Sequence, residues 1–264
     1  MIIDFHAHIY PQKIAVKASS NIGRFYNVSM CYDGSPEKLI ESGKKIGVEK
    51  YIVHSTATVA HQVESINNYI IQEVNAHTEF VGFGTIHPDY ENFDDELKRI
   101  KAAGLKGIKL HPDFQQFEVD TLKMDSVYEV ISALKMPILV HAGDYRYDFS
   151  GPKRIRHVIE KHPSLIVVAA HFGGYTEWDK ASEYLIGQRV WFDTSSTLWK
   201  LPVEKADEMI KKHGYENFLF GSDYPMWDHE DELSRFNRLN LTQEQREAIL
   251  YKNALRLLEL TSIL

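Results

Sequence analysis

Ile2-Ile-Asp-Phe-His-Ala-His8 decides the fold, because it is an apolar segment that ends on two histidines. The same pattern recurs in Gly107-Ile-Lys-Leu-His111, Pro137-Ile-Leu-Val-His141 and Ile166-Val-Val-Ala-Ala-His171, while Phe218-Leu-Phe-Gly-Ser-Asp223 ends on a carboxylate. Short apolar runs of this kind are typical of buried strands. A polar side chain at the carboxyl end of one strand after another is typical of the active face of a (β/α)₈ barrel.

Apolar and amphipathic segments alternate along the rest of the chain, as expected when strands and helices follow one another. We expect strands near residues 2–8, 49–55, 80–87, 107–111, 137–142, 165–171, 190–194 and 217–222. We expect helices between them, near residues 36–46, 62–77, 92–103, 125–134, 152–162, 177–187 and 203–213. A last helix is predicted to begin at the capping box Thr242-Gln-Glu-Gln245 and to end near residue 259.

Eight strands separated by helices favour a closed parallel barrel over an open doubly wound sheet. An open sheet that binds a nucleotide would carry a glycine-rich turn after an early strand, and none follows the first strand here. No linker rich in proline, glycine or serine divides the chain. The expected fold is therefore α/β, a single (β/α)₈ or TIM barrel domain over residues 1–264, a length typical of this fold.

Residues 9–35 form the longest stretch for which the pattern predicts no helix or strand. Connections of this length are usually functional lids or disordered loops. Because this stretch follows the first strand, we expect it to lie over the active face of the barrel. The chain after residue 224 is expected to cap the barrel with a loop and helices.

The composition disfavours several classes of protein. The net charge is -7 with histidine counted as neutral, which argues against nucleic acid as the main partner. No apolar run approaches the roughly 20 residues of a membrane span, so no membrane partner is expected. Cys31 is the only cysteine, so no disulfide can form within the chain, as is usual in a reducing cytoplasm. The chain starts without a basic stretch followed by a long apolar run, and we expect a cytoplasmic protein without a signal peptide.

The polar residues at the strand ends are of the types that bind a divalent metal ion. His6 and His8 are two positions apart on one strand, so their imidazoles point to the same side. Small residues follow His141, and glycines follow closely after His171, which leaves room for an ion and a substrate. Asp223 ends the eighth strand, where a buried carboxylate needs a positive partner. The alternative for each is a structural role, as a core histidine bonded to backbone or a capping aspartate.

Five motifs span nearly the whole chain in one order: Asp4-Phe-His-Ala-His8, Gly107-Ile-Lys-Leu-His-Pro112, Val140-His-Ala-Gly143, His171-Phe-Gly-Gly174 and Gly221-Ser-Asp-Tyr-Pro225. In these motifs the chain resembles the amidohydrolase superfamily, and within it the amidohydrolase-2 branch. That branch includes aminocarboxymuconate-semialdehyde decarboxylase-like proteins, resorcylate decarboxylases and pyrone-dicarboxylate lactonases. The resemblance implies a barrel enzyme that depends on one divalent metal ion, with zinc expected first and manganese as the alternative.

The resemblance also implies roles for individual residues. It implies that the ion is held by His6, His8, His141 and Asp223. Asp223 would in addition orient the water on the ion and take its proton. His171 would lie beside the ion as an acid/base or stabilising group, with a role as a further ligand as the alternative. In binuclear members of the superfamily a carboxylated lysine on the fourth strand bridges two ions; Lys109 holds that place, although the branch is usually mononuclear.

Four residues are candidates for contact with the substrate. His111 is expected to line the pocket at the end of the fourth strand. Arg146 follows the fifth strand and would bind a substrate carboxylate bidentately. Tyr10 and Trp199 lie in loops after strands and would stack on a planar substrate. The alternatives are solvated surface charge for the arginine and lid packing for the aromatic rings. His54, at the end of the second strand, is interpreted as a packing residue.

Two reactions fit this set of residues. In the first, metal-activated water attacks the carbonyl of an ester, lactone or amide in a small, carboxylated or cyclic organic substrate. In the second, a metal-dependent decarboxylase releases carbon dioxide from an aromatic or muconate-type acid without oxidation. The two reactions can share every ligand, so the residues alone do not separate them. We predict hydrolysis, with the carboxy-lyase reaction as the alternative. A barrel that only holds a metal is disfavoured, because no ligand is missing. The partners expected are a small-molecule substrate and a second copy of the chain in a homodimer.

Overall fold

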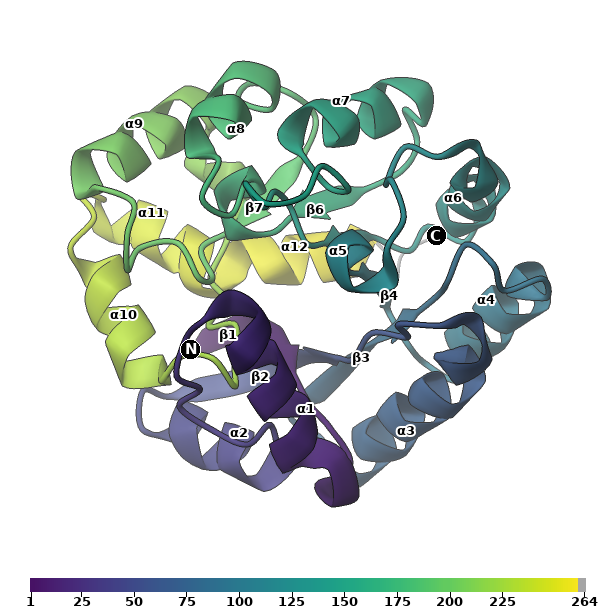
Figure 1. The fold of residues 1–264 in the computed structure, drawn as a ribbon. Helices are drawn as coiled ribbons and strands as arrows, with labels where there is room; N and C mark the ends of the chain where they lie inside the picture. Colours follow the sequence, from purple (N-terminus) through teal and green to yellow (C-terminus); the bar gives the residue numbers. More distant parts are fainter. Residues whose placement is uncertain (261–264) are drawn as a thin grey trace.

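Eight parallel strands form the barrel that the alternation of segments predicts (Figure 1). The computed structural model describes residues 1–260. Strands that follow one another in sequence are neighbours in the sheet, from β1 to β8. The expected strands and the fold class are therefore confirmed. The strands are β1 Ile2–His8, β2 Val48–His54, β3 Phe80–Thr85, β4 Gly107–Leu110, β5 Ile138–Val140, β6 Val167–Ala169, β7 Trp191–Asp193 and β8 Phe218–Leu219.

The ring of strands closes between β8 and β1 through backbone contacts. Asp223 N donates to His6 O at 2.9 Å, and His8 N donates to Tyr224 O at 2.8 Å. Ala7 also pairs with Tyr224 in an isolated parallel bridge. The loop after β8 is thereby fastened along the end of β1, which brings Asp223 beside the two histidines of that strand.

Helices surround the strands as an outer ring (Figure 1). The helices expected from the sequence are present as α2 Pro36–Lys44, α3 Val63–Ala76, α4 Phe93–Ala102, α6 Asp125–Ala133, α7 Pro152–Lys161, α8 Trp178–Tyr184 and α9 Val203–His213. Further segments are α1 Gln12–Tyr26, α5 Pro112–Gln115, α10 His229–Asn237, α11 Gln243–Glu247, a π-helical turn Ala248–Lys252 and α12 Asn253–Leu260. Short 3₁₀ turns cover Ala60–Gln62, Leu122–Met124, His171–Gly173 and Tyr215–Asn217. Among residues 1–260, no helix has the length and apolar character needed to cross a membrane.

Apolar side chains fill the interior of the barrel beneath the polar strand ends. Phe5, Phe83 and Leu139 are fully buried in this inner core. Ala254 and Leu257 of α12 belong to the same cluster. Figure 1 shows α12 running behind the strands, so this helix closes the barrel at the end where the strands begin. The expectation that the tail of the chain caps the barrel is met by α12.

Residues 9–35, expected to lack regular structure, contain the 15-residue helix α1. That expectation was wrong because the buried face of α1 is built from small residues such as Ala15 and Ser19, which give no apolar periodicity. Its large apolar side chains Ile14 and Val16 are exposed instead. Figure 1 shows α1 in front of β1 and β2, at the open end of the barrel. The position over the active face was therefore correct, while the conformation was not.

Candidate active site

The polar strand ends meet at the end of the barrel that α1 covers. His6 and His8 come from β1, His141 follows β5, His171 follows β6 and Asp223 follows β8. All five side chains are buried or nearly so. Because parallel strands deliver their carboxyl ends to one rim, residues distant in sequence share one site.

His6, His8 and Asp223 converge on a common point. The Nε2 atoms of His6 and His8 lie 3.2 Å apart. Each of them lies 3.4 Å from Oδ1 of Asp223. Donors bound to one tetrahedral zinc ion at 2.0–2.1 Å are about 3.3 Å from each other. The three atoms therefore have the separations and the chemistry that a divalent ion requires.

A buried carboxylate on β7 fixes the orientation of His6. Oδ2 of Asp193 lies 2.8 Å from Nδ1 of His6. The other oxygen of Asp193 accepts hydrogen bonds from the backbone N–H groups of His171 and Ser195. A carboxylate only accepts, so Nδ1 of His6 donates and Nε2 keeps its lone pair for an ion. The sequence interpretation missed Asp193, although it ends the apolar run Val190-Trp-Phe-Asp193 in the same way as the other site residues.

A hydrogen bond to the second carboxylate oxygen of Asp223, Oδ2, holds this side chain in place. The hydroxyl of Ser196 donates to Oδ2 of Asp223, and Nε1 of Trp227 donates to the Ser196 hydroxyl at 2.8 Å. Oδ1 of Asp223 is left facing His6 and His8. Burial opposes ionisation of this carboxyl group, but the imidazoles of His6 and His8 hold its pKa below the usual range. Asp223 is therefore a carboxylate at neutral pH.

Asp4 ties the end of β1 to the loop after β8. Its carboxylate accepts from the backbone N–H groups of His6 and Ser222, at 3.0 and 2.9 Å. Nε2 of His229 on α10 lies 3.0 Å from the same carboxylate. Gly221 is required nearby, because a Cβ at this position would lie 2.9 Å from Cβ of His6. Asp4 thus supports the first strand, as its position before His6 suggests.

The backbone turns sharply at two site residues. His171 has a φ of 60° and Asp223 has a φ of 59°. Positive φ is uncommon for residues other than glycine, and such conformations cluster at functional sites. Both residues lie in the loops that follow short strands, His171 after β6 and Asp223 after β8.

His141 and His171 lie next to each other, and the ring of His171 also stacks on that of His6 with centroids 5.1 Å apart. Nδ1 of His141 lies 3.0 Å from Nε2 of His171. Nδ1 of His171 donates to the carbonyl oxygen of Ser195 at 3.0 Å, which leaves Nε2 of His171 as the atom facing the cavity. The predicted ligand His141 thus lines the same cavity as His8 and Asp223, and its Nδ1 contacts the predicted acid/base residue.

Tyr26 at the end of α1 closes the site from above. Its hydroxyl lies 3.1 Å from Nε2 of His111 and 3.3 Å from Nε2 of His141. The rings of His111 and His141 stack with centroids 4.1 Å apart. His111 therefore lies in the site, as predicted for a residue that lines the pocket. Tyr26 is one of several aromatic residues in the stretch after the first strand, and nothing in the sequence singled it out as a site residue, because the helix that carries it was not expected.

Burial lowers the pKa of several basic side chains in the site. It lowers the pKa of the imidazoles of His6, His8, His54, His111 and His141, which are neutral at physiological pH and hence able to act as ligands. Burial also lowers the pKa of Lys109 to about 8, and its Nζ lies 2.9 Å from Nε2 of His6. The pKa of Asp113, which follows β4, is raised by burial to about 7.

Two cavities meet at the site. The central cavity measures about 20 Å³, close to the space of one water molecule, and its lining includes His8, His171, Asp223 and Tyr26. A larger cavity of about 750 Å³ lies between α1 and the segment that joins β2 to α3. His8, Ile22 and Phe114 line both cavities. A substrate larger than water would therefore need a shift of α1 or Tyr26, and the adjoining cavity offers the space.

The other predicted substrate contacts lie around these cavities. Tyr10 lines the larger cavity, and its ring stacks on His8 with centroids 6.5 Å apart. The guanidinium of Arg146 forms a bidentate pair with Asp144 and lies over the ring of Phe25. It also donates to the carbonyl oxygen of Phe25, so Arg146 fastens the end of α1.

Trp199 packs next to the residues around Asp223. Its ring packs against Trp227 with centroids 5.7 Å apart. Its Nε1 donates to the carbonyl oxygen of Ser196 at 3.0 Å. The structure thus places Trp199 next to the residues that hold Asp223.

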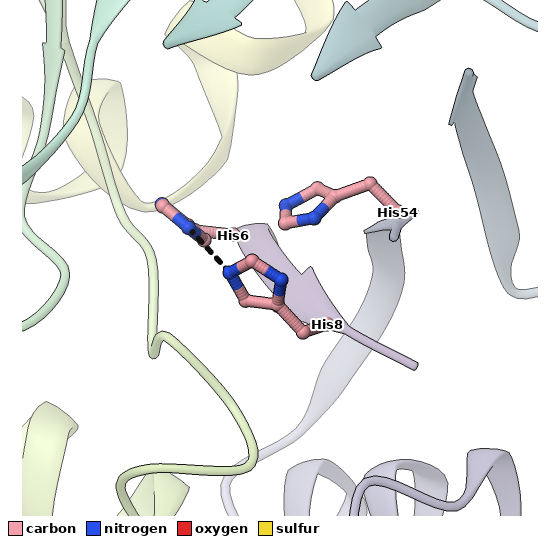
Figure 2. Close-up of side chains that lie close together, drawn as sticks. All are labelled: His6, His8 and His54. Atoms are coloured by element: carbon pink, nitrogen blue, oxygen red, sulfur yellow. Dashed lines mark hydrogen bonds between the residues drawn. The ribbon is translucent and has the colours of Figure 1, made fainter. Parts of the chain in front are cut away.

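A third histidine lies beside His6 and His8. His54 ends β2, and Figure 2 shows its ring next to the two imidazoles of β1. Its ligand atoms and those of His6 and His8 lie within 4.8 Å of one another. The sequence analysis interprets His54 as a packing residue. Its position at the end of an apolar strand, which it shares with the other site residues, is the signal that could have indicated a place in the site.

Solved structures with the same fold cover almost the whole chain. An uncharacterised TIM-barrel protein from Bordetella bronchiseptica is 18% identical, with a TM-score of 0.79 over 99% of both chains. A dihydroxybenzoic acid decarboxylase from Polaromonas sp. JS666, with bound manganese and 2-nitroresorcinol, is 14% identical, with a TM-score of 0.74 over 98% of this chain and 97% of that chain. A probable 2-pyrone-4,6-dicarboxylic acid hydrolase from Acinetobacter baumannii, with citric acid bound, is 18% identical, with a TM-score of 0.72 over 98% and 99%.

The family match extends over nearly the whole barrel. No curated protein sequence matches the chain. The profile of the amidohydrolase-2 family, described as amidohydrolase, matches residues 3–260. This range includes both histidines of β1, the histidines after β5 and β6, and Asp223. The chain therefore belongs to the amidohydrolase family.

Proposed function

We propose that this enzyme is a metal-dependent hydrolase that cleaves an ester, lactone or amide bond in a small organic acid. The observation that carries the proposal is the water-sized cavity between Asp223 and His171, next to the converging donors of His6 and His8. A hydrolase must hold one water beside an activating group and an acid/base, and this cavity offers that arrangement.

The donor set fits a divalent ion. His6, His8 and Asp223 would hold it, with His141 as the further ligand that the family resemblance implies. When bound, such an ion supplies Lewis-acid polarisation and makes a water molecule more acidic. Zinc suits imidazole-rich sites, and manganese is the alternative because it suits carboxylates. Manganese is also the ion bound in the dihydroxybenzoic acid decarboxylase from Polaromonas.

Asp223 and His171 would divide the proton transfers. Asp223 is ionised and its Oδ2 is occupied by Ser196, so Oδ1, the atom that faces His6 and His8, would both bind the ion and accept a proton from a water beside it. The hydrogen bond from Nδ1 of His171 to Ser195 O sets the tautomer, so Nε2 keeps a lone pair and can take up a proton, which the resulting imidazolium can then give to a leaving group. Each residue thus offers one atom to the reaction, and the rest of each side chain is anchored.

The larger cavity beside α1 would bind the body of the substrate. Its lining combines apolar side chains with hydroxyl and amide groups, and Lys17 contributes a cation. A substrate with a ring or short chain and a carboxylate would match this lining. Of the predicted substrate contacts, Tyr10 and His111 face the two cavities, whereas Arg146 would act by holding α1 in place.

Decarboxylation is the second candidate, because the solved structures with the same fold include decarboxylases. Isotopic labelling separates the two reactions. The metal-loaded enzyme is offered lactones, aryl esters, anilides and hydroxybenzoic acids in ¹⁸O-labelled D₂O. We expect ¹⁸O in a new product carboxylate. Carbon dioxide release with deuterium placed on carbon would instead assign the enzyme to the carboxy-lyases.

Metal content and one variant test the site itself. Inductively coupled plasma mass spectrometry should find about one zinc or manganese per chain, while two would promote Lys109 to a bridging ligand. His171→Ala should keep near-normal metal content and lose about 10²–10⁴-fold in turnover, as expected for an acid/base residue. Loss of the metal in His171→Ala would make His171 a ligand. A chain that takes up no divalent ion after reconstitution would contradict the proposed function.

A further inference from the structure

His54 is a buried histidine whose place in the site no family motif explains. It ends β2, next to β1 in the sheet, and is fully buried. Its ring meets the ring of His8 edge-on, with centroids 4.4 Å apart at 88°. It meets the ring of His6 at 5.0 Å and 69°. Figure 2 shows the three rings gathered around one space at the ends of β1 and β2.

Neither ring nitrogen of His54 has a hydrogen-bond partner among the described residues. Other buried histidines of the barrel do have partners. His229 contacts Ser42 and Asp4, and Nε2 of His213 contacts the carbonyl oxygen of Val190. A buried polar atom without a partner is costly in free energy, so native proteins retain such an atom mainly where a ligand completes it.

The geometry brings the nitrogens of His54 within reach of the ion that His6 and His8 would share. The ligand atoms of the three histidines lie within 4.8 Å of one another. Two imidazole nitrogens on one tetrahedral zinc ion are about 3.3 Å apart. The terminal torsion of histidine is broad, so a modest ring rotation closes the difference.

We propose that His54 is a third imidazole ligand of the divalent ion, alongside His6, His8 and Asp223. This inference rests on the proposed function, because it requires that the site binds an ion. Three neutral nitrogens and one carboxylate make a site that prefers zinc to manganese or magnesium. His141 would then be free to act with His171, or would complete a five-coordinate ion.

The test compares metal binding in three purified full-length proteins. The wild type, His54→Phe and the control His87→Phe are stripped of metal, and zinc affinity is measured by competition with a chromophoric chelator. His87 is a matched control, because it is also a buried histidine just after a barrel strand, but its Nδ1 accepts from the backbone N–H of Asp89. We expect at least 10-fold weaker zinc binding in His54→Phe and less than twofold change in His87→Phe.

Spectroscopy gives a readout independent of activity. Cobalt(II) is loaded into the wild type and His54→Phe, and the visible d–d bands report the ligands of the ion. The loss of one imidazole should shift these bands, and X-ray absorption of the zinc forms should show one histidine fewer in the variant. His54→Gln is measured in the same way, so that a folding defect of the phenylalanine variant leaves the inference testable.

The outcomes separate this inference from the proposed function. Wild-type zinc affinity and an unchanged cobalt spectrum in both His54 variants would overturn the role of His54 while leaving the metal site intact. A wild-type chain that binds no divalent ion would overturn both. Weaker binding with altered spectra in both variants, and neither effect in His87→Phe, would establish His54 as a ligand.

Discussion

The two sides of the site are built in different ways. On the β1–β8 side, His6 and Asp223 are anchored by side chains of the barrel itself, Asp193 and Ser196. On the β4–β5 side, the Nε2 atoms of the stacked His111 and His141 rings both meet the hydroxyl of Tyr26, which comes from α1. The first side is preorganised by the core, whereas the second depends on a helix over the barrel mouth.

This difference indicates that one side of the site is suited to metal binding and the other to substrate entry. A metal ion needs ligands whose positions do not change, and second-layer hydrogen bonds from the core provide that. A substrate needs an entrance, and the part of the site that contacts α1 can open when that helix moves. We therefore expect changes on the first side to alter metal affinity, and changes at the contact with α1 to alter turnover or substrate affinity.

The largest effect is expected from removing a ligand on each side. Asp223→Ala should lose the metal and at least about 10³-fold in turnover, because it removes both a ligand and the proton acceptor. His141→Ala should lose turnover to a similar extent. If His141 is a ligand its variant also loses the metal, and if the variant keeps the metal, His141 belongs with His171. Full metal and turnover in both variants would contradict the site assignment.

Weakening an anchor on the first side should produce a smaller effect. Asp193→Asn replaces the carboxylate that accepts from Nδ1 of His6 by a neutral amide. Loss of such a second-layer partner typically costs 10–100-fold in metal affinity, and we expect about that loss in a chelator competition. Turnover at saturating metal should recover most of its wild-type value. Unchanged metal affinity would show that the orientation of His6 does not depend on Asp193.

Acidification should lower the free energy of unfolding of the metal-free protein, because buried histidines lie on both sides of the site. Five histidines of the site have a pKa lowered by burial, whereas their unfolded value is about 6.5. The unfolded chain therefore binds more protons around and below pH 6.5, and each histidine lowers the free energy of unfolding by up to about 1.4 kcal/mol per pH unit as the pH falls.

Two buried acids act in the opposite direction over the same range. Burial raises the pKa of Asp113 to about 7 and that of Glu232 to about 8, so the folded state holds their protons more tightly than the unfolded chain. Five groups outweigh two, and urea unfolding in a metal chelator should show lower stability at pH 5.5 than at pH 6.5. Equal or higher stability at pH 5.5 would contradict this prediction.

The smallest effect is expected at the contact with α1. Tyr26→Phe removes the hydroxyl that meets His111 and His141 but keeps the ring. A single hydrogen bond contributes about 0.5–1.5 kcal/mol, so we expect a change of roughly 2–10-fold in kcat or KM. Metal affinity should stay within twofold, and the exposed neighbour Tyr147→Phe should change neither. A large loss of metal in Tyr26→Phe would contradict the expectation that only the β1–β8 side of the site controls metal affinity.

Much of the site was predictable because it follows the strands. The side chains of His6, His8, His111, His141, His171 and Asp223 all gather at one rim, as their positions at the ends of apolar runs indicate. Asp193 also ends an apolar run, Val190-Trp-Phe-Asp193, but this run contains a tryptophan and no histidine. For that reason Asp193 was not predicted as a site residue. The helix α1 was not predictable from apolar periodicity, because it buries small residues.

The amino-acid sequence by itself determined the barrel, the order of its strands and the residue types at its rim. Alternating apolar segments are local signals, and each can be read from a few neighbouring residues. Only the tertiary structure decided which of those residues act together. His6 meets Asp193 across 187 positions, and Tyr26 meets His141 across 115. Arg146 is engaged by Asp144 and Phe25, and no hydrogen-bond partner of the His54 ring lies within residues 1–260. Such contacts depend on how the strands close and where α1 lies, and no local pattern encodes them.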